Sequence, residues 1–214
     1  MRHLKIFLTL IALAVLAGAC ADPAANKPKA SVANAAPESP SAQHAGGDKL
    51  SISPENSKVE FVAAKVTRSH TGAFKKFTGS IDFVADSLES SRVTIDIDTS
   101  SVVTDEDQLT AHLKTPDFFD VARFPKATFV STKIEKGSTG GNTHNVTGNF
   151  DLHGVTKSIS FPATIQVTSD SVSVNSEFAI NRKDFGLVYP GKADDLIRDG
   201  VVIKLLLRVP RAKL

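Results

Sequence analysis

Alternation of apolar and polar residues with a period of two constrains this chain more than any other feature. The clearest run covers residues 93–98, where valine and isoleucine alternate with threonine and aspartate. Such a run is typical of a strand with one buried face. Eight runs of this kind follow one another along the chain, at residues 59–63, 77–83, 93–97, 127–134, 146–152, 159–165, 172–180 and 201–209. The sequence therefore predicts an all-β domain of eight one-sided strands.

The connection between the third and fourth runs carries the helix signals. Residues 104–107 form an acidic, capping-box-like start, and Leu109 and Leu113 make an i, i+4 pair. Thr115 can cap a further short turn of helix with Pro116 at its first position. We therefore expect one or two short helices between strands 3 and 4.

Two adjacent phenylalanines, Phe118 and Phe119, follow these helix signals. Neighbouring residues cannot share one face of a helical turn. We expect this pair to seal one end of an apolar cavity.

The first residues have the composition of an export signal. A basic start precedes the apolar run 6–16 and three small residues, and the run is too short to span a membrane. Cys20, the sole cysteine, follows directly and resembles the lipidated residue of bacterial lipoproteins, although Ala17 replaces the usual leucine. We predict a signal peptide over 1–19 and lipidation of Cys20. Ordinary cleavage that leaves a free thiol is the alternative.

Residues 20–48 are rich in alanine, proline and serine and have almost no large apolar side chains. Such a segment buries too little surface to offset its ordering entropy, so we predict a disordered tether. Residues 49–214 are long enough for one domain with its own core.

Charge and motif spacing disfavour several function classes. Residues 1–19 hold two of the 25 basic residues and none of the 23 acidic ones, so the remaining chain has a formal charge of zero. We find no basic stripe with interleaved aromatics, which disfavours nucleic-acid binding. The histidines lack metal-ligand spacing, and no nucleophile motif occurs. We expect no catalytic residue, no metal site and no cofactor.

Three motifs in the strand region give the chain a family resemblance. They are Gly72-x-Phe74-x-x-Phe77-x-Gly79-x-Ile81, Gly154-Val155-Thr156-Lys157 and Asn181-Arg182-Lys183-Asp184-Phe185-Gly186. Eight one-sided strands can form a sandwich or a closed barrel, and the residues alone leave both open. In order and spacing the motifs resemble the YceI-like family, the lipocalin-like polyisoprenoid-binding proteins of the bacterial periplasm. Leu109 and Thr110 depart from it, because the family has Arg-Asp before the helix His-Leu.

The resemblance implies an eight-stranded antiparallel lipocalin-like barrel with a lipid in its lumen. The domain has no tryptophan and one tyrosine, so its aromatic wall offers little directional hydrogen bonding and suits a hydrocarbon better than a sugar. Arg68 and Arg182 are candidates for binding a polar head group. The predicted lumen residues are Phe61, Phe77, Ile81, Phe83, Ile95, Phe118, Phe119, Phe129, Phe150, Phe161, Phe178 and Leu205.

These observations predict a lipid carrier or store on the periplasmic face of the bacterial envelope, held to the membrane through Cys20. The expected ligand is a long-chain amphipathic lipid of polyisoprenoid or quinone type, and a homodimer is left open. A completely packed structural or interaction module without a ligand is the alternative. An integral outer-membrane barrel is disfavoured because Asp96, Glu177 and Lys204 lie on the polar strand faces.

Overall fold

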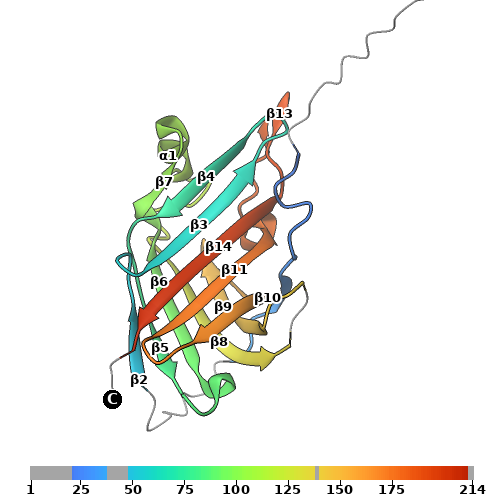
Figure 1. Cartoon of the computed structure of the whole chain (residues 1–214). Coiled ribbons are helices and arrows are strands. Elements are labelled where there is room, and N and C mark those ends of the chain that lie inside the picture. Colours follow the sequence, from blue (N-terminus) through green and yellow to red (C-terminus); the bar gives the residue numbers. More distant parts are fainter. Residues whose placement is uncertain (1–20, 38–47, 138–139, 212–214) are drawn as a thin grey trace, which may run out of the picture.

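A computed structural model describes residues 21–37, 48–137 and 140–211, which form one strongly curled sheet of twelve strands and a separate two-stranded hairpin (Figure 1). The strands of the curled sheet are β1 Ser31–Asn34, β2 Asp48–Ile52, β3 Ser57–Ala64, β4 Ser69–Phe74, β5 Phe77–Phe83, β6 Arg92–Asp98, β7 Val102–Thr104, β8 Lys126–Lys136, β9 His144–Leu152, β10 Val155–Val167, β11 Ser171–Asn181 and β14 Gly200–Pro210. The hairpin consists of β12 Gly191–Lys192 and β13 Asp195–Leu196.

All eight predicted runs are strands, namely β3, β5, β6, β8, β9, β10, β11 and β14. The predicted count of eight is nevertheless wrong, because six shorter strands accompany them. Two of these, β2 and β4, are separated from β3 and β5 by bends at residues 53–56 and 75–76. Each bend changes the strand's partner, so that β2 pairs with β5 while β3 pairs with β14 and β4. β2 and β4 each hold at most two large apolar side chains, too few to mark a one-sided strand.

The hydrogen-bonded order of the sheet is open at both ends. It runs β2-β5-β6-β8-β9-β10-β11-β14-β3-β4-β7, and every one of these pairings is antiparallel. The edge strand β2 lies beside β14 without a paired register. The predicted closed barrel is therefore corrected to a curled half-barrel.

Helices are short and lie in connections. Helix α1 (Asp107–Leu113) and the 3-10 turn η2 (Thr99–Ser101) fall between β6 and β8, which confirms the prediction of one or two short helices there. Two further 3-10 turns are η1 (Leu88–Ser90) and η3 (Arg182–Phe185). The predicted helix start at Thr115 is wrong. The chain turns there instead, and the Thr115 hydroxyl donates to the carbonyl oxygen of His112.

Residues 21–37 are ordered against the sheet, so the predicted tether is wrong for this part; residues 38–47 lie outside the described residues. Strand β1 pairs antiparallel with the first half of β10, and Ala30 and Ala179 are joined by a backbone hydrogen bond of 2.8 Å. Because β10 pairs with β11 only over Thr164–Val167, the segment occupies the gap where these strands separate. It satisfies backbone groups that the gap would leave unpaired.

Candidate functional site

The inner face of the curled sheet encloses an apolar cavity of about 110 Å³. Its wall comes from seven strands of the sheet together with Phe74 of β4. Glu60 is the one polar residue there, and it alternates with Val59 and Phe61 along β3. The apolar lining residues are Val59, Phe61, Phe74, Val93, Ile95, Ile97, Phe129, Ile134, Val146, Phe150, Ile159, Phe161, Ile165, Val174, Phe178, Ile180, Ile203, Leu205 and Leu207.

The cavity is larger than one or two waters need but smaller than the roughly 300–1,000 Å³ of typical ligand pockets. Apolar cavities of roughly 150 Å³ stay dry and accept small apolar molecules. The space therefore suits a short length of hydrocarbon, while a longer chain requires lining side chains to move.

Three phenyl rings of the cavity wall, those of Phe129, Phe161 and Phe178, pack against one another, and a longer ligand would have to move them. The rings of Phe161 and Phe178 stack with centroids 4.2 Å apart at 8°. Phe129 packs against Phe161 with a centroid distance of 5.7 Å. Such ring pairs contribute about 0.5–1.5 kcal/mol beyond their buried area.

Two glycines make room for aromatic rings of the cavity wall. A Cβ built on Gly72 would lie 2.2 Å from the Phe61 ring, and one on Gly148 would lie 2.5 Å from both the Phe129 ring and the Val130 carbonyl oxygen. A side chain at either position would thus push a ring from its place. The glycines of the sequence were a signal for this arrangement that strand parity alone does not give.

Seven of the twelve predicted lumen residues line the cavity: Phe61, Ile95, Phe129, Phe150, Phe161, Phe178 and Leu205. Phe77, Ile81 and Phe83 are instead buried in the core of the sheet away from the cavity. Strand parity places all of them on the inner face, but it cannot tell how far along the sheet the cavity extends.

Phe118 and Phe119 lie outside the cavity wall, at the end of the sheet covered by α1. Phe119 packs on Phe74, a lining residue, with ring centroids 5.7 Å apart. Phe118 contacts Tyr189 and His112 at centroid distances of 5.4 and 4.9 Å. The pair thus contributes a second layer that closes this end.

Arg182 holds a loop together and is not turned toward the cavity. It is 4% exposed, and its guanidinium donates to the carbonyl oxygens of Leu187, Ile197 and Arg198. It also lies 3.3 Å from the Asp199 carboxylate. Burial lowers the pKa of Arg182, an effect that Asp199 opposes. Because its guanidinium donors are already engaged, Arg182 is unsuited to the predicted head-group role. The sequence motif does not reveal this, since the carbonyl partners lie in a separate loop.

Arg68, the other head-group candidate, stands at the same end of the sheet on the β3–β4 turn. Its side chain is 62% exposed and lies 3.5 Å from the Glu106 carboxylate. Lys65 of the same turn bridges to Ile197 of the loop that Arg182 holds. Arg68 and Arg182 are therefore brought to one end but take different roles there.

His144 is a buried polar group that the sequence reasoning missed. Its residue is 6% exposed, its Nδ1 lies 2.7 Å from the Thr143 hydroxyl, and its Nε2 has no partner among the described residues. It shares the inner face of β9 with Val146. Burial lowers the pKa of His144, with Glu89 and Lys136 as the charged neighbours.

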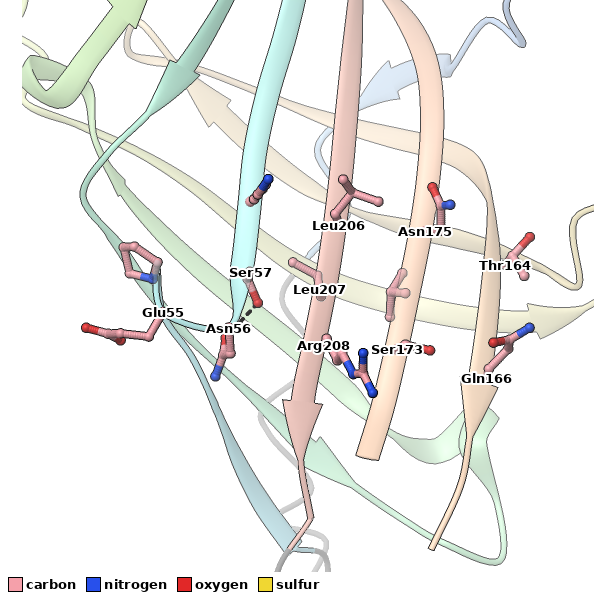
Figure 2. A pocket seen from close by; sticks show the side chains of 13 residues that line it. Glu55, Asn56, Ser57, Thr164, Gln166, Ser173, Asn175, Leu206, Leu207 and Arg208 are labelled. Carbon is pink, nitrogen blue, oxygen red and sulfur yellow. Dashed lines mark hydrogen bonds between the residues drawn. The ribbon is translucent and has the colours of Figure 1, made fainter. Parts of the chain in front are cut away.

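A larger hollow of about 510 Å³ lies on strands β3, β10, β11 and β14 and on the β2–β3 bend (Figure 2). Its side chains are mostly polar, including Asn175, Gln166 and Arg208. Within 21–37, 48–137 and 140–211, no group of three His, Cys, Asp or Glu residues is arranged so that it could hold a metal ion. No helix of these residues is long and apolar enough to span a membrane.

Comparison with known proteins matches the sheet to one family. A YceI-like domain model covers residues 50–209. A UPF0312 protein of Pseudomonas putida strain W619 is 35% identical over 126 residues, and one of Pseudomonas syringae pv. syringae is 36% identical. Each match covers 56% of this chain and 65% of the relative, so the chain spans just under two thirds of these relatives.

Solved structures share the fold over most of their length. BcnA of Burkholderia cenocepacia is 27% identical with a TM-score of 0.64, covering 73% of this chain and 98% of that protein. A polyisoprenoid-binding domain from Saccharophagus degradans is 20% identical with a TM-score of 0.61, covering 78% and 99%. Because the family model matches residues 50–209, which are most of the chain, this chain belongs to the YceI-like domain family.

Proposed function

We propose that this protein is a lipid-binding protein of the bacterial envelope that carries or stores a long-chain amphipathic lipid of polyisoprenoid or quinone type without performing chemistry. The observation that carries the proposal is the cavity inside the curled sheet, whose wall is apolar except for Glu60. The structural likeness to a domain described as polyisoprenoid-binding supports the ligand class.

The apolar part of the ligand would enter the cavity and displace the Phe161–Phe178 stack. Each buried methylene contributes about 0.8 kcal/mol, so ten carbons provide roughly 8 kcal/mol before association costs. Rings that leave the core would lose roughly 1.5–3 kcal/mol of burial each besides the roughly 0.5–1.5 kcal/mol of the pair, so binding favours ring movements that keep both rings buried.

The proposed location rests on the N-terminal sequence. We propose export through residues 1–19 and a lipid anchor at Cys20, which places the protein on the periplasmic side of a membrane. Intact-mass measurement of the mature protein tests this step, since lipidation adds the mass of the acyl groups to Cys20.

Native mass spectrometry of protein purified without harsh detergent tests ligand binding. We expect a co-purifying lipid, and extraction then identifies it. Leu205→Phe adds volume inside the cavity and should lower lipid occupancy. Leu206→Phe on the same strand is the matched control, because Leu206 is 42% exposed and lies outside the cavity wall.

A packed interaction module is the second candidate, and the three rings in the lumen favour it. In that case no lipid would be retained or taken up. Leu205→Phe would then change only stability, and equal lipid occupancy in the two phenylalanine variants would count against a ligand site in the lumen.

A further inference from the structure

We propose that one end of the curled sheet rests on the bilayer surface, with Val66, Val188 and Leu196 in contact with lipid. We call this the loop end and define it by residues 65–68 and 187–198. The inference rests on the lipid anchor of the proposed function and adds an orientation and a contact surface to it.

Exposed apolar side chains gather at the loop end. Five large apolar residues within 21–37, 48–137 and 140–211 stand out as exposed, and three of them are Val66 at 41%, Val188 at 62% and Leu196 at 49%. Val66 and Leu196 are neighbours, since the Val66 amide donates to the Leu196 carbonyl oxygen at 3.0 Å. Val188 belongs to the loop that leads to the β12–β13 hairpin. Clustered exposed apolar residues mark an interaction surface.

The position of the first described residues determines what this surface faces. The Asp22 carboxylate lies 3.9 Å from Arg198 and accepts the Ala24 amide at 2.9 Å. Ala24 is 5% exposed and packs with Ala179 and Val202. Only two residue steps separate Cys20 from Asp22, a reach of about 7 Å. Acyl chains on Cys20 must therefore enter the membrane close to Arg198, at the loop end.

Because residues 21–37 pack on the sheet, an anchor on Cys20 would restrict how the domain is oriented on the membrane. A disordered tether of 28 residues would let the domain turn freely, whereas the segment in Figure 1 runs along the sheet from the end that carries β13. The anchor thus selects one orientation of the domain. In that orientation the bilayer that holds the anchor covers the apolar surface.

The loop end is braced as a rigid surface. Asp195 binds Lys65 at 3.1 Å and the Thr67 hydroxyl at 2.8 Å, and the Arg198 amide donates to the Ala64 carbonyl oxygen at 2.8 Å. Of the cationic residues of the loop end, Lys65 and Arg198 are paired with an aspartate and Arg68 with Glu106, while the exposed Lys192 forms no ion pair among the described residues. Contact should therefore depend mainly on apolar insertion, with a smaller contribution from anionic lipid.

The orientation also gives the lipid ligand a path from the bilayer into the lumen. Tyr189 follows the exposed Val188 and packs on Phe118, which belongs to the layer that closes the lumen. A lipid that enters past Tyr189 would come directly from the bilayer beneath the loop end.

Single-tryptophan variants test the orientation, because the chain has no tryptophan of its own. Val188→Trp reports the loop end. Val167→Trp is the matched control, since Val167 is 43% exposed and pairs with Val172 at the opposite end of β11. The acylated full-length protein is reconstituted in phosphatidylcholine vesicles that contain brominated lipid. We expect a blue shift and loss of emission for Val188→Trp and neither for Val167→Trp.

The outcomes separate the two proposals. Equal emission of the two variants in acylated protein would overturn the orientation and leave lipid binding in the lumen intact. An intact mass without acyl groups would overturn the anchor and the orientation together. Loss of co-purifying lipid in native mass spectra, with Val188→Trp still quenched, would overturn the lumen site alone.

Discussion

Lys27 Nζ lies 2.9 Å from Glu177 Oε2 and ties the N-terminal segment to β11. Lys204 of β14 approaches the other carboxylate oxygen at 3.2 Å. Lys27 is the main cause that lowers the pKa of Glu177, and Lys204 adds to it. This shared carboxylate joins the N-terminal segment to the neighbouring strands β11 and β14.

We expect Lys27→Ala to loosen residues 21–37 while leaving the sheet folded. Both side chains of the pair are 35% exposed, so the loss in unfolding free energy should stay below about 1 kcal/mol. Hydrogen exchange at the Ala30 and Ala179 amides should quicken. Lys29→Ala is the control, because no ion pair of Lys29 occurs in the described part of the chain. Equal exchange rates in both variants would show that the Lys27–Glu177 pair does not hold residues 21–37 to the sheet.

Acid should weaken the same attachment. The folded-state pKa of Glu177 is lowered, so its contribution is present above the unfolded value of 4.5 and disappears as the pH falls through the folded value. In Glu177→Gln this part of the pH dependence should vanish. Urea unfolding across that pH range measures it, and an unchanged acid limb in the variant would contradict the assignment.

Arg182→Met should destabilise the loop end by about 3 kcal/mol, because it removes a buried cation and leaves carbonyl oxygens of Leu187, Ile197 and Arg198 without their donor. Arg68→Met, at an exposed pair, should cost less than about 1 kcal/mol. Chemical denaturation compares the two. If Arg182 instead bound a lipid head group, the variant would lose ligand selectivity at unchanged stability.

Sequence reasoning found the long strands because each carries its own periodic pattern, and it found seven wall residues because parity is local. It missed β1, since residues 31–34 (Ser-Val-Ala-Asn) hold one large apolar side chain and signal no strand, and they pair only because β10 and β11 separate there. It misassigned Arg182 for a similar reason. The carbonyl oxygens that engage the guanidinium belong to positions 5 to 16 residues away in an irregular loop. Both errors concern long-range backbone groups that composition does not report.

Gly148→Ala should destabilise the fold by about 1–3 kcal/mol and disturb the cavity. Its Cβ would lie 2.5 Å from the Val130 carbonyl oxygen, a backbone atom that cannot turn away, as well as from the Phe129 ring. Gly72→Ala should cost less, since the three atoms nearest to its Cβ all belong to the ring of Phe61, a side chain that can shift into the cavity more easily than a backbone carbonyl can move. Thermal unfolding ranks the stability of the two variants. A less stable Gly72→Ala would contradict the view that the backbone clash at Gly148 costs more than the ring contact at Gly72.

His144 should make the fold sensitive to mild acid. Burial lowers its folded-state pKa below the ordinary 6.5, and Nε2 has no partner among the described residues. The unfolded chain therefore binds a proton that the folded chain does not, so stability falls as the pH drops below about 6.5 until the folded value is reached. The slope for one proton is at most about 1.4 kcal/mol per pH unit.

Replacing the imidazole by an apolar side chain should remove this slope. We expect His144→Leu to have a smaller difference in unfolding free energy between pH 7.5 and 5.5 than the wild type, because no group at that position then takes up a proton on unfolding. Urea denaturation at the two pH values measures it. His153→Asn controls for loss of an imidazole elsewhere, since Asn tolerates the positive φ of 56° at that turn. A slope that persists in His144→Leu while disappearing in His153→Asn would place the sensitivity at the turn and not in the wall of the sheet.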